Sequence, residues 1–522
     1  MRLLLKLFDE AARTGLLAAV AAGLYVAVFF TLNNLTMLRG GGVLFLFGVL
    51  IAPLSVASML VYYPLQRAGR GAWARIAVAF MISTFLLFSL RTPLLAIPAA
   101  AALLHAFPPG RTLLANTVLF GVPAALLTVF LHKRLKQYAA ALGILVVAAV
   151  LIDAGRRTDW ISTEAEKKLP PELQQIVLAE TPNIYFILAD AYASLAYMKD
   201  RGIDITELTE FLSDSDFRLY EDTYSNYQPT TSAMPAFLDM EHHYYRLTGH
   251  GVDFSEVDKA SRRVIGGENN VSNILRMNGY SIQYIHNGSY LLLQGCSADS
   301  CFPEVDGLAG ARIVLSHILR MDLLSDDDKA WKTTTIEEMR AEISKLIGDQ
   351  GETPRFQYIH AFKPGHSPNA WAGKCNEARQ TEKYAVRVAS AGNFLRQLIR
   401  EITEQDPSAI IVVAGDHGPF IAKRCARNAY IDDVADYRDR AGAIMAIRWP
   451  RSYDGEYDDR IVSGVNLFRY VLASLAKDPA PLLETAVADD VFIRARGKIW
   501  IVVEDGRPLD RPRRMSAGKR RR

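Results

Sequence analysis

The chain has 522 residues, a formal net charge of +3 and a 50 % share of hydrophobic residues. It is too long for one ordinary domain, so at least two parts are expected. The net charge says little about partners, and the sequence contains no nucleic-acid-binding motif, so nucleic acid is not expected as a partner.

The first part, residues 1–155, is predicted to be an all-α transmembrane anchor of about five helices. Apolar stretches at 15–32, 42–63 and 112–131 each approach the ~20 residues that cross a bilayer core. A cleavable signal peptide has a single short apolar run, whereas several runs follow one another here. We therefore expect a multi-pass membrane protein.

Short basic segments set the expected orientation of this anchor. Lysines and arginines gather at residues 2–13, 67–75 and 133–136, which the positive-inside rule places in the cytoplasm. An odd number of crossings, completed by the apolar run 138–152, then delivers the rest of the chain outside. An even number would leave it in the cytoplasm. We expect the inner (plasma) membrane, with the remaining chain periplasmic or extracytoplasmic.

All four cysteines lie after the anchor, at positions 296, 301, 375 and 425. An even number of cysteines in an exported domain favours disulfides. Cys296 and Cys301 are the expected local pair, which leaves Cys375 with Cys425. Four reduced thiols in a cytosolic domain are the alternative.

Three further segments follow the anchor. The polar stretch 156–181 carries a short amphipathic pattern and is predicted to be a juxtamembrane linker helix. Strand-like and helical runs then alternate over 182–506, which predicts an α/β sandwich around a mostly parallel sheet. The last 16 residues, 507–522, carry eight lysines or arginines without apolar periodicity and are predicted to be a basic disordered tail.

Two apolar strands end in residues that can bind a metal ion. Asp190 follows the run 183–189, and Asp416 and His417 follow the run 409–415. Ligands bind outside the carboxyl ends of strands in open parallel sheets, so the two ends can converge on one ion. Aspartate and neutral histidine are typical ligands of zinc or manganese. The alternatives are a helix N-cap for Asp190 and a hydrogen-bonded strand end for the other pair.

Between these strands, Thr230 stands just before a predicted helix start and is the candidate nucleophile. A helix N-terminus stabilises negative charge. A metal ion can activate a hydroxyl, as it lowers the pKa of bound water from roughly 15.7 to about 7. An ordinary N-cap is the alternative role, and only the companion motifs favour the nucleophile. Thr231 and Ser232 are reserve candidates.

A third strand pattern carries two histidines and a lysine at and beyond its end: His360, Lys363 and His366. Such groups suit the binding of an anionic phosphate or the protonation of a leaving oxygen. We expect all three to bind substrate and His366 to be catalytic. His360 lies inside the strand pattern, where a hydrogen-bonded core role is the alternative.

The order of these motifs resembles the alkaline phosphatase superfamily, within it the membrane-anchored sulfatase-like branch that includes lipoteichoic acid synthases and phosphoethanolamine transferases. The similarity covers residues 182 to about 495. It implies a sulfatase-like catalytic domain over 182–506, with Thr230 as nucleophile. One divalent cation, zinc or manganese, would be held by Asp190, Thr230, Asp416 and His417. His366, Ser367 and Pro368 resemble a substrate-binding motif of that family.

Two departures from the family pattern narrow the expected activity. The Cys-x-Pro-Ser-Arg motif of true sulfatases and a second aspartate after Asp190 are missing, which disfavours sulfate-ester hydrolysis. No histidine follows His417, which makes a one-ion site the safer expectation.

The resemblance implies that a phosphoethanolamine or phosphoglycerol head group moves from a phospholipid donor to an envelope glycan or lipid, through a phospho-threonine. One alternative is a phosphodiesterase or phosphatase that uses the same site. The other is a catalytically silent envelope scaffold.

Overall fold

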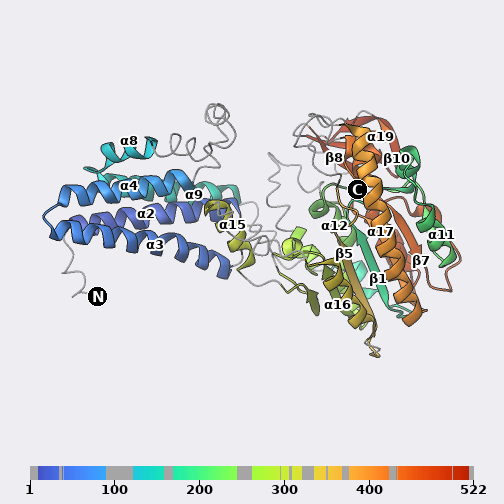
Figure 1. The fold of residues 1–522 in the computed structure, drawn as a ribbon. Coiled ribbons are helices and arrows are strands. Elements are labelled where there is room, and N and C mark those ends of the chain that lie inside the picture. Colours follow the sequence, from blue (N-terminus) through green and yellow to red (C-terminus); the bar gives the residue numbers. More distant parts are fainter. Residues whose placement is uncertain are drawn as a thin grey trace. The chain divides into compact units, whose positions relative to one another are not determined.

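The computed structural model describes residues 10–34, 38, 40–89, 122–157, 169–243, 261–293, 295–304, 308–319, 334–348, 351–366, 376–422, 431, 433–495 and 498–515. The chain forms two compact units (Figure 1). One comprises Met1–Ala165 with Asp306–Ala330, and the other Glu166–Val305 with Trp331–Arg522.

The first unit consists of packed helices, drawn in blue to cyan in Figure 1. Its helices from the first third of the chain are α2 (Glu10–Asn33), α3 (Gly40–Arg67), α4 (Gly71–Ser89), α8 (Val122–Leu131) and α9 (Leu135–Arg157). Small residues let α2 and α3 approach closely, since a Cβ on Gly23 would lie 2.9 Å from the Ile51 Cα.

Two helical stretches of this unit, Gly15–Asn33 and Gly41–Arg67, are long and apolar enough to cross a membrane. The apolar stretches Gly71–Leu87 and Gln137–Ala148 are shorter. The helical character of the N-terminal region is thus confirmed, while the prediction of about five crossings goes further than the two stretches that meet both criteria among the described residues.

A helix from the middle of the chain also belongs to the first unit. α15 (Ala309–Leu319) packs against α3 and α4. Its residues Ala311, Val314 and Ile318 recur at helical spacing and are buried in the apolar cluster of this unit. This segment lies inside the range 182–506 that the sequence predicts to be the catalytic domain, yet α15 packs with the N-terminal helices.

The second unit is built around a seven-stranded sheet of order β2-β7-β6-β1-β5-β3-β4. Its strands are β1 (Ile184–Ala189), β2 (Arg218–Tyr220), β3 (Ser281–His286), β4 (Ser300–Phe302), β5 (Arg355–Ala361), β6 (Ile410–Gly415) and β7 (Met445–Arg448). Only the pairings of β7, with β2 and β6, are antiparallel. The expected mostly parallel α/β architecture is therefore confirmed.

Helices cover both faces of this sheet, and β1 shows why its sequence is apolar throughout. Ile184, Phe186 and Leu188 point to one core cluster, whereas Tyr185 and Ile187 point to the other. The first cluster includes α12 (Thr230–Asp239), α14 (Asn270–Met277), α20 (Leu467–Ala473) and α21 (Ala480–Glu484). The second includes α10 (Leu195–Asp200), α11 (Thr206–Asp214), α16 (Ile336–Gly348) and α17 (Glu377–Gln405), and α16 and α17 lie over the strands in Figure 1.

A separate three-stranded antiparallel sheet has the order β10-β9-β8, with β8 (Val491–Ala495), β9 (Lys498–Glu504) and β10 (Arg507–Arg514). β10 pairs with β9, so the prediction of a disordered tail is wrong for Arg507–Arg514. The basic composition of this segment predicts disorder, but its hydrogen bonds to β9 stabilise it as a strand although it has no apolar pattern of its own. Residues 516–522 lie outside the described part of the chain.

The segment before β1 also differs from expectation. In place of the expected amphipathic helix it forms a short 3-10 turn, Pro171–Gln175, and continues in extended conformation at Ile176. Leu173, Ile176 and Leu178 are buried in the core of the α/β unit. The described part of the linker therefore packs as part of that unit. Further 3-10 turns among the described residues are η4 (Ser289–Leu292), η6 (Asp458–Arg460) and η7 (Gly464–Asn466).

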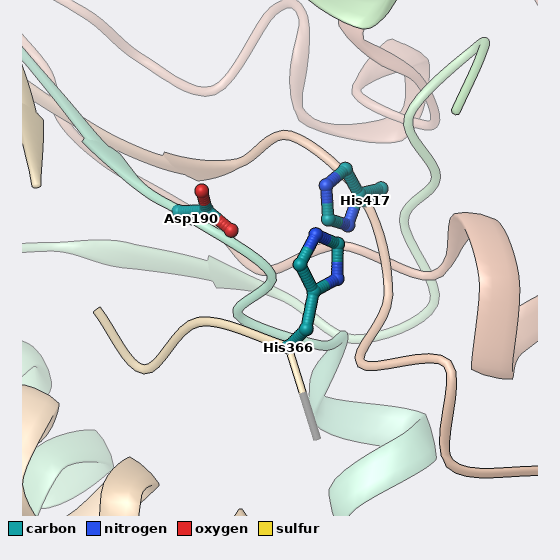
Figure 2. Close-up of side chains that lie close together, drawn as sticks. All are labelled: Asp190, His366 and His417. Atoms are coloured by element: carbon teal, nitrogen blue, oxygen red, sulfur yellow. The ribbon is translucent and has the colours of Figure 1, made fainter. Parts of the chain in front are cut away.

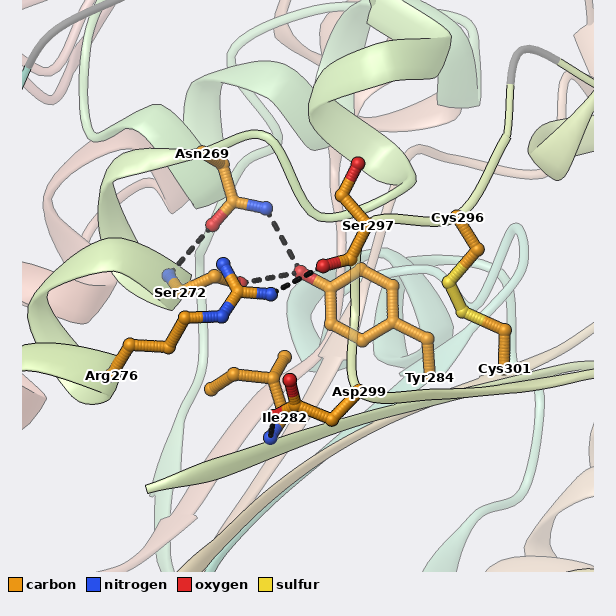
Figure 3. The surroundings of a disulfide bond; sticks show 9 residues. All are labelled: Asn269, Ser272, Arg276, Ile282, Tyr284, Cys296, Ser297, Asp299 and Cys301. Atoms are coloured by element: carbon orange, nitrogen blue, oxygen red, sulfur yellow. Dashed lines mark hydrogen bonds between the residues drawn. A yellow bond between two sulfur atoms is a disulfide. The ribbon is translucent and has the colours of Figure 1, made fainter. Parts of the chain in front are cut away.

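A disulfide joins Cys296 and Cys301 beside the edge strand β4, as expected for the local pair (Figure 3). Side-chain hydrogen bonds hold the loop it closes to its surroundings: Arg276 Nη2 donates to the Ser297 carbonyl at 2.5 Å, and the Ile282 amide donates to Asp299 Oδ2 at 2.7 Å. Backbone hydrogen bonds from the Ser297 and Asp299 amides add to them. Cys375 and Cys425 lie outside the described residues.

Candidate metal centre

The site is built where three adjacent parallel strands end. β1 lies between β6 and β5, and Ala189 is in register with Gly415 on one side and with Ala361 on the other. Asp190 and Asp416 each come one residue later, so both emerge at the same edge of the sheet. The carboxyl ends of parallel strands are where such sheets bind ligands.

Backbone contacts fix the two acidic turns against each other. The Ala191 amide donates to Asp416 Oδ1 at 2.9 Å, and the Gly365 amide donates to the Asp190 carbonyl at 2.9 Å. Ala191 adopts a left-handed φ of 56°. A Cβ on Gly415 would lie 2.3 Å from the Tyr192 carbonyl oxygen, so only glycine allows this close approach.

Two overlapping groups of ligand-type side chains meet at this edge, and Asp190 belongs to both. In the first, one ligand atom each of Asp190, His360 and Asp416 lie within 4.8 Å of one another. In the second, the same holds for Asp190, His366 and His417. Figure 2 shows the Asp190 carboxylate beside the two imidazoles of this second group.

The donor set matches a metal ion because several of its atoms are buried and unsatisfied. Asp190 Oδ1, Asp416 Oδ2, His360 Nε2 and His417 Nε2 have no hydrogen-bond partner among the described residues. Buried polar groups are almost always hydrogen-bonded, and an unpaired buried carboxylate is costly. Carboxylate oxygen and imidazole nitrogen are the ligands that zinc and manganese accept.

The pKa shifts of two of these residues also favour a bound cation. Burial and, secondarily, the nearby Asp416 carboxylate raise the pKa of Asp190 well above its ordinary value. Burial and the neighbouring His417 lower the pKa of His360 to about 3, so its imidazole is neutral at pH 7. A neutral imidazole keeps the lone pair that a metal needs.

His417 is oriented for ligation by its own neighbour. Its Nδ1 lies 2.9 Å from the Gly418 carbonyl oxygen, which can only accept, so Nδ1 carries the proton and Nε2 the lone pair. Its ring stacks on His366 at 4.7 Å between centroids and on Phe420 at 4.8 Å. Phe420 had not been singled out from the sequence.

Thr230 is the first residue of α12, one position earlier than the predicted helix start. It is partly exposed, whereas Thr231 and Ser232 are both 7 % exposed. Of the three candidate hydroxyls, Thr230 is thus the most accessible to a substrate. The role of Thr230 as nucleophile and metal ligand stays a prediction.

The predicted substrate-binding residues lie in different surroundings. Lys363 Nζ donates to Ser390 Oγ on α17 at 3.2 Å and belongs to neither ligand group. His360 is completely buried and lies with the ligand-type residues. His366 joins the second ligand group, while Ser367 and Pro368 lie outside the described residues.

Sequence reasoning did not place His360 among the candidate ligands. The register of β5 against β1 explains its position, since His360 lies opposite Leu188 on β1, two residues before Asp190. That register requires the strand order, because only the pairing of β5 with β1 brings the two residues together.

Residues 182–475 match the sulfatase family. No curated protein matches the chain. Among solved structures, the chain is similar to lipooligosaccharide phosphoethanolamine transferase A from Neisseria meningitidis, with 13 % identity and a TM-score of 0.42 over 88 % of this chain and 95 % of that one.

It is also similar to the periplasmic domain of phosphoethanolamine transferase EptC from Campylobacter jejuni (12 %, TM-score 0.36, 56 % of this chain and 89 % of that one). A further likeness is to phosphonate monoester hydrolase from Agrobacterium radiobacter (12 %, TM-score 0.39, 64 % and 89 %). With TM-scores below 0.5, these likenesses carry no functional argument.

Proposed function

This chain belongs to the sulfatase family, within the alkaline phosphatase superfamily, and on that premise we propose that it is a metal-dependent phosphotransferase. It takes a phosphoethanolamine or phosphoglycerol head group from a phospholipid and transfers it to an envelope glycan or lipid. Threonine in place of the sulfatase cysteine motif supports phosphoryl rather than sulfuryl chemistry, because a threonine cannot be converted to formylglycine.

The convergence of Asp190, Asp416 and His417 at one edge of the sheet is the observation that supports the proposal most directly. Asp190 and Asp416 are 226 positions apart in sequence, yet the ligand atoms lie in two groups, each within 4.8 Å. A scaffold without catalysis has no need for the half-buried Asp190 carboxylate beside the buried Asp416 carboxylate, since their repulsion destabilises the fold.

Asp190, Asp416 and His417 would hold the divalent cation together with Thr230, and His360 is a further donor in reach of the two aspartates. When bound, such an ion stabilises an alkoxide at neutral pH, as it does for bound water. His366, from the second ligand group, is kept for proton transfer in this proposal, which involves one ion.

Thr230 acts as the nucleophile. Its Oγ attacks the phosphorus of the donor, a bond from Oγ to phosphorus forms, and the bond from phosphorus to the diacylglycerol oxygen breaks. His366, beside His417, supplies the proton that the departing oxygen takes up. An acceptor hydroxyl then attacks the phospho-threonine and gives its proton to the His366 imidazole, the new bond from the acceptor oxygen to phosphorus forms, and the Thr230 oxygen leaves as the alkoxide with which the cycle began.

The membrane setting is part of the proposal. Two helical stretches are long and apolar enough to span a bilayer, and the Cys296–Cys301 disulfide suits an oxidising, extracytoplasmic compartment. We place the protein in the inner membrane with its catalytic domain, 182–506, outside. An enzyme tethered there meets a lipid donor at high effective concentration.

Incubation of the purified full-length protein with head-group-labelled phospholipid tests the proposal. We expect labelled protein, with the label mapped to Thr230 by mass spectrometry, and its transfer to an added glycan or lipid acceptor. Thr231→Ala is the matched control and should still be labelled. Release of free head group at the same rate with and without acceptor would indicate a hydrolase. Absence of label, turnover and bound metal would indicate a scaffold and overturn the proposal.

A further inference from the structure

The last turn of one helix contacts both halves of the proposed site. In α19 (Val434–Ala441), the Arg440 carbonyl accepts from the Gly418 amide at 3.1 Å, next to His417. The following carbonyl, of Ala441, accepts from the Ser225 amide at 2.7 Å, in the segment that leads to Thr230. The carboxyl end of α19 thus joins the metal-binding turn to the nucleophile segment.

The Arg440 side chain adds a second connection to the nucleophile segment. Its Nε and Nη2 donate to Gln228 Oε1 at 3.3 and 3.2 Å, and Nη2 also donates to the Arg494 carbonyl at 3.0 Å. Gln228 stands two residues before Thr230. The intervening Pro229 carbonyl accepts from the Ser232 and Ala233 amides, so Gln228 is linked to the first turn of α12 through one residue.

Burial of the charged Arg440 side chain costs folding free energy, which argues for a role beyond packing. Arg440 is 1 % exposed and forms no ion pair with a described carboxylate, and its Nη1 has no partner among the described residues. Burial lowers its pKa to about 10, so it remains charged at pH 7. The nearby Asp439 and Asp436 carboxylates favour its charged form but form no ion pair with it, so they offset only part of the cost of burying this cation.

We propose that Arg440 is a positioning residue: its guanidinium fixes Gln228, and through it the start of α12 with Thr230, relative to the turn that carries Asp416 and His417. Two donors on one rigid plane restrain the amide more than a single point charge can. The consequence for catalysis rests on the proposed function, whereas the restraint on α12 does not.

Arg440→Met and Arg440→Lys in the full-length protein test this role. Arg448→Lys is the matched control, because Arg448 also donates to carbonyls, of Ala409 and Pro407, at the opposite end of β6. By hydrogen exchange, we expect the amides of Ser232 and Ala233 to exchange faster in both Arg440 variants than in the wild type and the control. Arg440→Lys remains informative if Arg440→Met does not fold.

For turnover of the labelled phospholipid, we expect kcat to fall by about 100-fold in Arg440→Met, as misplacement of a reacting group by ~1 Å can cost. KM and metal content should stay within two-fold of wild type, and Arg440→Lys should recover part of kcat. A general loss of fold would change metal content as well.

Three outcomes separate the inference from the function on which it rests. Unchanged exchange at the start of α12 overturns the positioning role, whether or not the protein is active. Higher KM at unchanged kcat would show that Arg440 binds substrate instead, and would also overturn it. If the wild type itself transfers no head group, but the Arg440 variants still exchange faster at the start of α12, the restraint on α12 is supported and the proposed phosphotransferase function is rejected.

Discussion

The carboxylates at the two ends of strands β1 and β6 differ in how far the chain satisfies their hydrogen bonds. At the amino ends, Asp406 accepts from Asn183 Nδ2 at 2.7 Å through one oxygen and from Ser408 Oγ at 3.1 Å through the other. At the carboxyl ends, Asp190 Oδ1 and Asp416 Oδ2 accept nothing from the described residues. The same strands therefore end in a satisfied structural carboxylate on one side and unsatisfied ones on the other.

The unsatisfied carboxylate oxygens at the carboxyl ends of β1 and β6 therefore lower the stability of the fold at that place. A carboxylate whose oxygens are satisfied by the chain stabilises the protein on its own, while one left without donors needs an external cation. Substitutions at the two strand ends, and at the Thr230 hydroxyl that the proposed metal ion would activate, test this difference.

The largest effect is expected for Thr230→Ala. Loss of the attacking oxygen should lower kcat by about four orders of magnitude or more, as removal of a nucleophile does in other enzymes. Thermal unfolding should change little, because Thr230 is partly exposed. Steady-state turnover of labelled phospholipid checks the first point and calorimetry the second. An active variant would move the nucleophile to Thr231 or Ser232.

His417→Ala should remove bound metal and activity together. Residues that only support a metal ligand change affinity by about 10–100-fold, so deletion of a ligand should weaken binding by more than about 100-fold. Metal analysis after dialysis, beside an activity assay, measures both. The predicted link between site and ion would be wrong if the variant kept a full complement of metal.

Asp489 tests an intermediate case, a buried carboxylate that the chain does satisfy. Ser463 Oγ donates to it at 2.6 Å and Asn466 Nδ2 at 3.1 Å, yet burial raises its pKa to about 6. An unfolded aspartate titrates near ~3.9, so the folded state favours the protonated form. Its contribution to stability is therefore greatest below pH 4 and is lost as the pH rises through 6.

Asp489→Asn should remove this dependence. We expect the variant to gain on the order of 2–3 kcal/mol relative to wild type between pH 4 and pH 7, from the pKa difference. Urea unfolding at several pH values provides the measurement. A stability difference that does not change with pH would contradict the assignment.

Asp406→Ala, at the satisfied end, should have the smallest effect. It leaves Asn183 Nδ2 without its acceptor and should cost about 1 kcal/mol of unfolding free energy. Metal content and kcat should stay at wild-type values, since the site lies at the other end of the strands. Loss of metal in this variant would erase the distinction between the two ends.

The sequence located Asp190, Asp416 and His417 because each follows an unbroken apolar run, and such runs are buried strands whatever their neighbours. It also indicated the local disulfide, since Cys296 and Cys301 are close in sequence. It did not reveal that His360 joins the ligand-type residues, that Arg440 reaches Gln228, or that Arg507–Arg514 pairs as a strand. These features depend on contacts between segments that are distant or outwardly polar, which local periodicity does not report.

By itself, then, the sequence determined the apolar helices, the apolar strands β1 and β6 and the chemical type of the residues at their ends, because burial and periodicity are properties of short segments. Tertiary structure alone decided the order β6-β1-β5, which sets three strand ends side by side. It also decided that α15 packs with the N-terminal helices. The physical reason is that a metal-type site requires atoms within a few ångströms, and only strand pairing and helix packing bring residues so far apart in sequence to that distance.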